Sequence, residues 1–142
     1  MRQMTGQNNM YPKQLIQTFM EQLWNQKDLS VIDRFLSHET LIHSPMKTTQ
    51  GKEEMKTIAR HWLHAFPDLH CNWQDWIAED NKVMVRWMAK GTHLGPFMEF
   101  PAIGKSVQYE GISIFQLDKE IILEYWGLVD RFNLIQQLKS IC

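Results

Sequence analysis

The hydrophobic period of this chain changes at Pro67, and this change constrains the fold more than any other feature. Before Pro67, apolar residues recur at three- and four-residue spacings. This predicts amphipathic helices over residues 10–24 and 52–66, with a short helix over 29–35 between them. After Pro67, apolar and polar residues alternate, which predicts strands over most of the remaining chain. Helices followed by strands predict an α+β domain whose curved sheet, mixed or antiparallel, wraps around three N-terminal helices.

The predicted strands form two hairpins. A turn at residues 79–81 closes the first hairpin, and Asp118 with Lys119 closes the second. A crossover rich in glycine and proline, residues 91–105, connects the two hairpins. One face of the strand that opens the first hairpin is expected to hold Leu69, Cys71, Trp73, Asp75 and Ile77.

Two short segments complete the expected fold. The sequence ETLIHSP predicts a brief extended segment that Pro45 ends. The sequence NLIQQL predicts a closing helix, with Asn133 and Gln136 as its capping box.

Length and charge limit the kinds of partner. The 142 residues suit one domain over residues 1–142, with residues 1–9 expected to form a flexible tail. The formal net charge is -1 and like charges do not cluster, so neither a nucleic acid nor a membrane is the expected partner. The sequence shows neither a signal peptide nor a stretch long enough to span a bilayer, which predicts a cytoplasmic protein. Cys71 and Cys142 are expected to be reduced thiols.

Large apolar side chains are abundant, with six Trp, seven Phe and nine Met. Most are expected in the core, where Trp and Met fill irregular space. The remainder would suit the wall of an apolar cavity. The composition therefore favours a small apolar or aromatic molecule as the partner.

Several short motifs follow one another in order: Phe66-Pro67-Asp68-Leu69, Gly91-Thr92-His93, Gly104-Lys105, Gly111-Ile112, and Trp126 with Asp130 before a closing LIQQL. As a set, over about residues 10–140, they resemble the SnoaL-like polyketide cyclases of the nuclear transport factor two-like superfamily. The resemblance implies a cone-shaped, cystatin-like α+β barrel, usually dimeric, with an apolar cavity open at one end. It also implies acid/base chemistry without a cofactor.

The resemblance also reveals a departure. Many family members carry Asp or His at the positions that Gly127 and Ser113 occupy here. If the acid/base of the family lies on that odd-numbered face of the last two strands, this chain lacks it.

The even-numbered face of the last two strands offers other acids. With the turn at residues 118–119, this face brings Gln108 and Glu110 close to Asp130 at the end remote from the turn. If this face lines the cavity, the repulsion between two carboxylates beside apolar walls would raise the proton affinity of one of them, which predicts a general acid/base from Asp130 or Glu110. Glu124 and Trp126 share this face and are predicted ligand contacts.

A structural alternative exists for both acids. Asp130 could cap the closing helix, because Asp is a favoured N-cap residue. Glu110 could form an ion pair with Arg86 or Arg131.

The histidines give weaker signals. His93 is predicted to hydrogen-bond a substrate oxygen or, alternatively, to hold a turn. His43 is a predicted ligand contact or a solvent-facing imidazole, and Trp62 is a predicted ligand contact. His61 and His64 fall outside the apolar stripe of their helix without a third ligand nearby, so no metal site is expected.

These features together predict a cofactor-free cyclase or isomerase. Asp130 or Glu110 would abstract a proton next to a carbonyl, and His93 or Gln108 would stabilise the enolate oxygen. Two rival interpretations stay open: a non-catalytic module that binds a small molecule, and a structural dimer whose cavity is filled.

Overall fold

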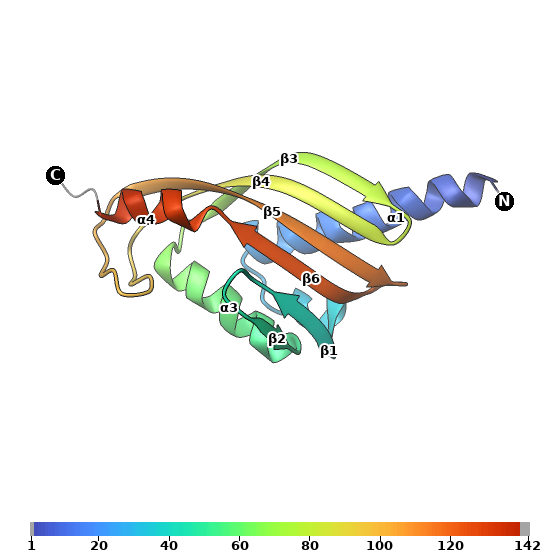
Figure 1. The fold of residues 1–142 in the computed structure, drawn as a ribbon, viewed down its shortest axis with the longest axis horizontal. Coiled ribbons are helices and arrows are strands. Elements are labelled where there is room, and N and C mark those ends of the chain that lie inside the picture. The colour runs from blue at the N-terminus through green and yellow to red at the C-terminus, as the bar shows by residue number, and fades with distance from the viewer. Residues whose placement is uncertain (1, 140–142) are drawn as a thin grey trace.

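The computed structural model describes residues 2–139, with side chains from residue 11 onward. Four α-helices occur in it: α1 (Arg2–Met20), α2 (Val31–Phe35), α3 (Lys52–Ala65) and α4 (Arg131–Lys139), and a π-helical turn, η1 (Glu21–Asn25), extends α1. The strands are β1 (Leu36–His43), β2 (Thr48–Gln50), β3 (His70–Glu79), β4 (Lys82–Thr92), β5 (Ser106–Asp118) and β6 (Ile121–Val129). Figure 1 shows the long strands lying over α3.

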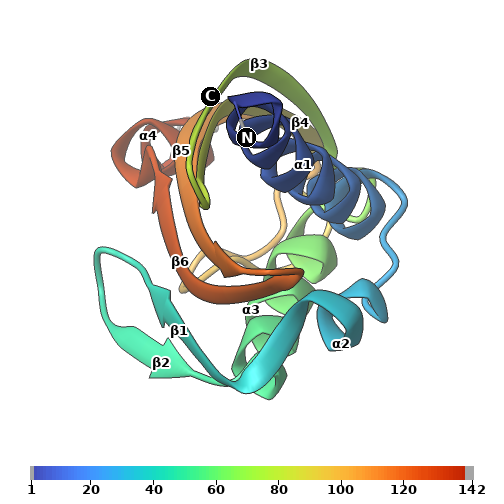
Figure 2. The same ribbon diagram turned by 90° about the vertical axis from the view of Figure 1, so that its right-hand side faces the viewer.

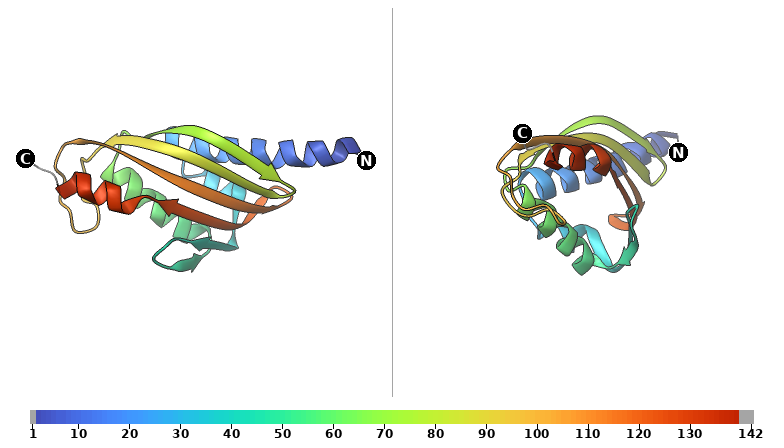
Figure 3. Two further views of the ribbon diagram at one scale, coloured as in Figure 1. Left: turned by 45° about the horizontal axis from the view of Figure 1, so that its top comes forward. Right: turned by 60° about the vertical axis from the view of Figure 1, so that its left-hand side comes forward.

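All six strands join one curved sheet in the order β2-β1-β6-β5-β4-β3. Strands β3 to β6 pair antiparallel, and β1 pairs parallel with β6, so the sheet is mixed. Because β2 and β3 are both edges, the sheet curls around α1 and α3 without closing into a barrel (Figures 2 and 3). The expected α+β architecture is confirmed, and the parallel β1–β6 pair is the part that periodicity did not predict.

The core lies between the helices and the concave face of the sheet. Alternate residues of β5 are buried, and they meet the apolar stripes of α1 and α3. Fully buried side chains there include Phe19, Met55, Phe66 and Phe115. The amphipathic helices and the two-faced strands therefore share one apolar interior.

A bulge in β3 corrects the predicted face of that strand. Its pairing with β4 shifts between Trp73 and Asp75, so one residue is skipped. Trp76 and Ala78 then pack against the core, while Ile77 is 59% exposed. The prediction that Asp75 and Ile77 share a face with Cys71 is wrong, because a bulge reverses the alternation after it.

The second hairpin turns one residue later than predicted. Asp118 pairs with Ile121, which places Lys119 and Glu120 in the turn, and Lys119 has a positive φ of 57°. A bulge near Gln116 then adds a further offset. Beyond it, Ile112 faces Leu128 and not Trp126, the partner expected from the predicted turn, so the register is shifted by two residues. The even-numbered residues of the two strands still share one face.

The closing helix also starts earlier than predicted. Asp130 is its cap, because its Oδ1 accepts a hydrogen bond of 3.1 Å from the Asn133 N–H. The predicted capping box at Asn133 and Gln136 is therefore wrong, since both residues lie inside α4.

The first helix is longer than predicted. It begins at Arg2, so the segment expected as a flexible tail is helical, and it projects beyond the rest of the molecule in Figure 1. Leu23 and Trp24 continue the buried stripe through η1. No helix among the described residues is both long and apolar enough to cross a membrane. Cys142 lies outside the described residues.

Candidate functional site

An apolar pocket lies between the helices and the concave face of the sheet. Its volume is about 60 Å³, room for roughly four water molecules. Elements α1, η1, α3 and β3 to β6 all contribute to its wall, which is formed by Met20, Trp24, Ile58, Trp62, Leu69, Cys71, Trp73, Trp87, Ala89, Tyr109, Ser113, Tyr125 and Val129. The wall contains neither a carboxylate nor an imidazole.

Three polar side chains lie together at this wall. The Trp87 indole N–H donates to Ser113 Oγ over 3.0 Å. The Ser113 hydroxyl also lies close enough to the Tyr125 hydroxyl to lower its pKa. Because Ser113 Oγ already accepts from Trp87, its own proton can go to the Tyr125 oxygen, and this leaves the phenolic proton of Tyr125 to a third partner.

Burial controls the protonation of Tyr125. It raises the pKa of the phenol above its usual range, and the hydrogen bond from Ser113 opposes this shift only in part. Tyr125 therefore stays protonated at neutral pH. It can donate a hydrogen bond into the pocket but cannot act there as a base.

Two glycines make room for this group. A side chain at Gly111 would put its Cβ 2.3 Å from the Trp87 ring, so the indole lies directly over the strand. A Cβ at Gly127 would lie 2.8 Å from the Tyr125 hydroxyl oxygen. The Tyr125 hydroxyl thus occupies the space into which a side chain at position 127 would project.

The wall near β3 is held by polar contacts from η1. The Asn25 side chain accepts from the Cys71 N–H over 2.7 Å and donates to the Cys71 carbonyl over 3.0 Å. Glu21 Oε1 accepts from the Trp73 indole N–H over 3.1 Å. These bonds fix β3 to the helix. Burial raises the pKa of the Cys71 thiol to about 12.

The predicted acid/base pair lies outside this pocket. Glu110 and Asp130 are neighbours, since the Asp130 N–H donates to the Glu110 carbonyl, but both side chains are exposed. Gln108 is exposed on the same outer face. The prediction that the even-numbered face lines the cavity is wrong, because the odd-numbered residues of β5 are the buried ones.

The alternative role as a helix cap is the correct one for Asp130. Asp130 caps α4 as described above. Arg86 pairs with Asp75 at 2.7 Å, so it is not the partner of Glu110.

Three predicted ligand contacts come together on the outer face instead. His43 stacks on Trp126 with ring centres 5.3 Å apart, and its Nε2 lies 2.6 Å from Glu124 Oε2. Thr48 Oγ1 lies 2.9 Å from the other ring nitrogen. The Lys82 ammonium lies over the Trp126 ring. This cluster borders an open groove on the convex side of the sheet and ties β1, β2, β4 and β6 together.

His93 is fully buried but does not line the pocket. Neither ring nitrogen makes a hydrogen bond of normal geometry, and the ring packs 5.6 Å from that of Phe66. Burial lowers the pKa of His93, and the nearby Gly95 backbone opposes that shift. Its backbone bonds to Gly104 and Lys105 hold the two ends of the crossover together. His93 and Glu110 therefore point to opposite faces of the sheet.

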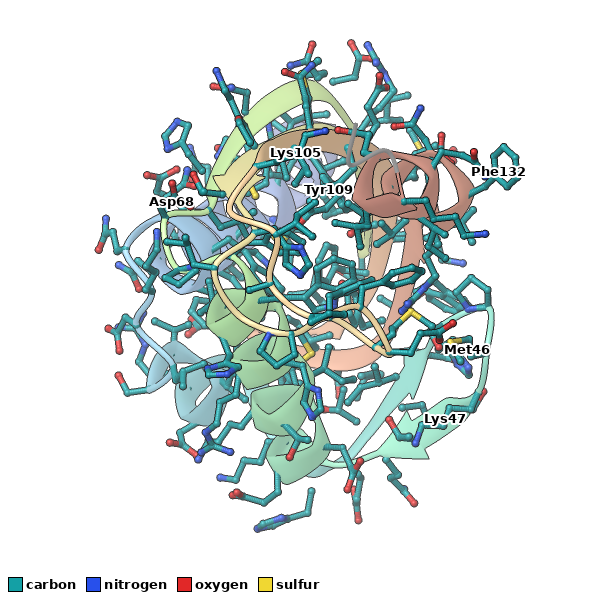
Figure 4. The ribbon with its side chains drawn as sticks, turned by 90° about the vertical axis from the view of Figure 1, so that its left-hand side faces the viewer. Met46, Lys47, Asp68, Lys105, Tyr109 and Phe132 are labelled. Atoms are coloured by element: carbon teal, nitrogen blue, oxygen red, sulfur yellow. The ribbon has the colours of Figure 1, made fainter. Side chains whose placement is uncertain are left out.

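Of the predicted contacts, Trp62 lines the pocket. Its ring lies 4.9 Å from that of Phe97 and 5.4 Å from that of Tyr109. Figure 4 views this end of the molecule, with Tyr109 inside the curve of the sheet and Phe132 pointing into solvent. His61 and His64 are both exposed on α3.

The hydroxyls of Ser113 and Tyr125 were not predicted as site groups, because the sequence prediction gave preference to carboxylates. The signal was present in β5, whose odd positions read Val, Tyr, Gly, Ser, Phe and Leu, whereas the even positions include Gln108, Glu110 and Gln116. The more apolar set was the one to assign to the interior.

Comparisons with known proteins agree with the fold. The chain superimposes on AclR, a proposed hydroxylase from Streptomyces galilaeus, at 25% identity with a TM-score of 0.83, over 93% of this chain and 83% of that one. It matches the structure of a proposed SnoaL-like polyketide cyclase from Jannaschia at 16% identity and TM-score 0.88, over 94% of both chains. IdmH from Streptomyces antibioticus, a proposed polyketide cyclase, matches at 22% identity and TM-score 0.78, over 91% of this chain and 99% of that one.

No curated protein matches the sequence. The family model of the SnoaL-like polyketide cyclases matches residues 14–138, which is most of the chain. The chain belongs to the SnoaL-like polyketide cyclase family.

Proposed function

We propose that this chain binds one small, mainly apolar molecule in the inner pocket and holds an oxygen of that molecule by the Tyr125 hydroxyl. The observation that carries the proposal is the series of donors from Trp87 through Ser113 to Tyr125 inside an otherwise apolar wall. Such a pocket, with few polar groups set among aromatic rings, suits a ligand whose orientation is fixed by one hydrogen bond.

The Tyr125 donor suggests what chemistry the pocket supports. Many family members carry Asp or His at the positions that Ser113 and Gly127 occupy here, and Gly127 leaves the space of such a side chain to the Tyr125 oxygen. A protonated phenol in a low-dielectric site polarises a carbonyl and stabilises negative charge that develops on its oxygen. A proton-abstracting base is absent from the pocket wall, so binding is the first candidate function and cyclisation or isomerisation the second.

The resting pocket favours a small ligand. Pockets for drug-sized molecules measure roughly 300–1,000 Å³, well above the 60 Å³ found here. A polycyclic ligand of the kind expected from the sequence would require wall side chains such as Trp62 or Trp73 to move. A single ring is therefore the appropriate first probe.

The test compares acetophenone with α-methylstyrene, in which a methylene group replaces the carbonyl oxygen and the shape is kept, by ligand-observed NMR titration. The native protein should bind the ketone more tightly, and Tyr125→Phe should reduce that preference about three- to tenfold, the value of one neutral hydrogen bond. Tyr11→Phe is the matched control, because the Tyr11 hydroxyl is exposed and bonds Glu120. An unchanged preference in Tyr125→Phe would refute the role of the hydroxyl.

The homodimer expected from the family resemblance stays a prediction, and the outer face of the sheet is where we place it. Ile112, Ile114 and Leu128 surround Trp126 there, and Leu128 is 58% exposed. A two-fold contact needs only one such self-complementary patch. Sedimentation velocity should show a dimer for the native chain and a monomer for Leu128→Glu; identical profiles for both would move the contact elsewhere.

A further inference from the structure

One arginine, Arg131, lies against the pocket wall without lining the pocket itself. Arg131 begins α4, two residues after Val129 of the pocket wall. Its guanidinium carbon lies 5.6 Å from the centre of the Trp62 ring, which also lines the pocket. The guanidinium therefore lies where α3, α4 and the crossover meet. Ser113 and Tyr125 lie farther along β5 and β6, toward the hairpin turn.

This arginine lacks an anionic partner among the described residues. Its Nε is buried without a hydrogen-bond partner, and the one contact of Nη1 is with the Met98 sulfur at 3.9 Å, a weak acceptor. The other arginines with assigned contacts differ: Arg86 pairs with Asp75, and Arg34 donates to Gln22. A half-buried guanidinium that has lost water without gaining an anion is costly to keep.

Nearby carboxylates are engaged or point away. Asp130 precedes Arg131 but caps α4 through Asn133. Glu110 is exposed on the outer face of the sheet. Burial also lowers the pKa of Arg131, as expected of a cation without an anion beside it. The partner that this group can accept is thus one that arrives with a ligand.

We propose that the ligand of the inner pocket is a carboxylic acid, and that Arg131 binds its carboxylate at the pocket edge. This inference rests on the proposed function, because it names the class of molecule that enters the same pocket. The planar guanidinium offers paired donors that match a carboxylate, and it lies over the ring of Trp62, which lines the pocket. The aromatic wall would hold the apolar body of the acid.

The experiment compares benzoate with benzamide, which has the same shape without the charge, by ligand-observed NMR titration at pH 7 and low salt. The native protein should bind benzoate at least tenfold more tightly than benzamide. Arg131→Gln should abolish this preference and leave benzamide binding within about twofold. Arg131→Lys should keep part of it, because the charge remains but the paired donors are lost. Arg86→Gln is the matched control and should behave as the native protein.

The outcomes separate this inference from the proposed function. Equal binding of benzoate and benzamide by the native protein would overturn the carboxylate assignment and leave the pocket function intact. A benzoate preference that survives in Arg131→Gln would also overturn it. Failure of benzamide, benzoate and acetophenone alike to bind would overturn both. Should Arg131→Gln fail to fold, the native preference and the Arg131→Lys variant still decide the question.

Discussion

The two faces of the same sheet differ in the kind of polar group they carry. The convex face holds the carboxylates and the imidazole, including Glu110, Asp130 and the pair of His43 with Glu124. At the pocket, the concave face carries neutral groups among apolar neighbours: the hydroxyls of Tyr109, Ser113 and Tyr125, the indole N–H of Trp87 and the thiol of Cys71. Groups that ionise at neutral pH stay where water solvates them, and the interior keeps neutral donors, which cost less to bury.

This difference bears on where chemistry can occur. A carboxylate on the outer face is solvated, so any ligand must compete with water for it. A neutral donor inside an apolar wall interacts more strongly, since little water screens it. The neutral donors of the inner pocket are weaker acids than the outer carboxylates, but they lie where an interaction with a ligand is stronger.

Thiol reactivity should show the largest contrast between the faces. The pKa of Cys71 rises from 9.0 to about 12, so its thiolate is about a thousandfold rarer than that of an ordinary thiol. In a Cys142→Ser background, alkylation of native Cys71 by iodoacetamide should be at least that much slower than alkylation of an exposed cysteine.

The matched control for Cys71 is Gln108→Cys on the outer face, made with both natural cysteines replaced by serine. Denaturant should bring the two alkylation rates together. Comparable rates in the native state would mean that solvent reaches the inner face freely.

Substitution by alanine should have unequal consequences on the two faces. At Gly111, the Cβ of alanine would lie 2.3 Å from Trp87 and 2.7 Å from the Leu128 carbonyl, and neither can withdraw cheaply. Gly111→Ala should therefore lower the free energy of unfolding by about 2–3 kcal/mol. Glu110→Ala, one residue away on the outer face, should change it by less than about 0.5 kcal/mol. Urea denaturation measures both, and equal losses would contradict the assignment of faces.

His93 should make stability fall in mild acid. Its pKa is lowered in the folded protein, so below about pH 6.5 the unfolded chain binds a proton that the folded chain does not. The free energy of unfolding should drop as pH decreases from 6.5 toward the folded pKa, with a slope approaching about 1.4 kcal/mol per pH unit. Below the folded pKa this slope disappears.

Variants isolate this contribution. His93→Leu should lose the drop, whereas His61→Gln, an exposed histidine of α3, should keep it. Denaturant titrations between pH 5 and 8 give the comparison. The same slope in His93→Leu and the native protein would assign the titration to other groups.

The smallest expected effect concerns Asp130. Removal of its N-cap bond in Asp130→Ala should lower the free energy of unfolding by about 1 kcal/mol. Binding of acetophenone should not change, because the carboxylate lies outside the pocket. If Asp130→Ala lost affinity for acetophenone without losing stability, Asp130 would belong to the ligand site.

Much of the fold could be predicted from the sequence. The stripes of α1 and α3 and the alternation of β4 and β5 set element type and order, because each period belongs to one kind of secondary structure. The bulge after Trp73 could not be predicted, since nothing in the sequence Trp73-Gln74-Asp75 signals an extra residue. Trp62 was predicted near a ligand, whereas the roles assigned to Ser113 and Tyr125 depend on contacts between strands.

By itself, the sequence determined the α+β class, the order of the elements, the family, and the existence of two chemically different faces on the last strands. Only the tertiary structure decided which face turns inward and how β1 joins β6. It also decided that the Tyr125 hydroxyl fills the space over Gly127. The physical reason is that alternation fixes which residues share a face, whereas the direction of that face depends on helices packed from far along the chain and on bulges that shift the alternation by one residue.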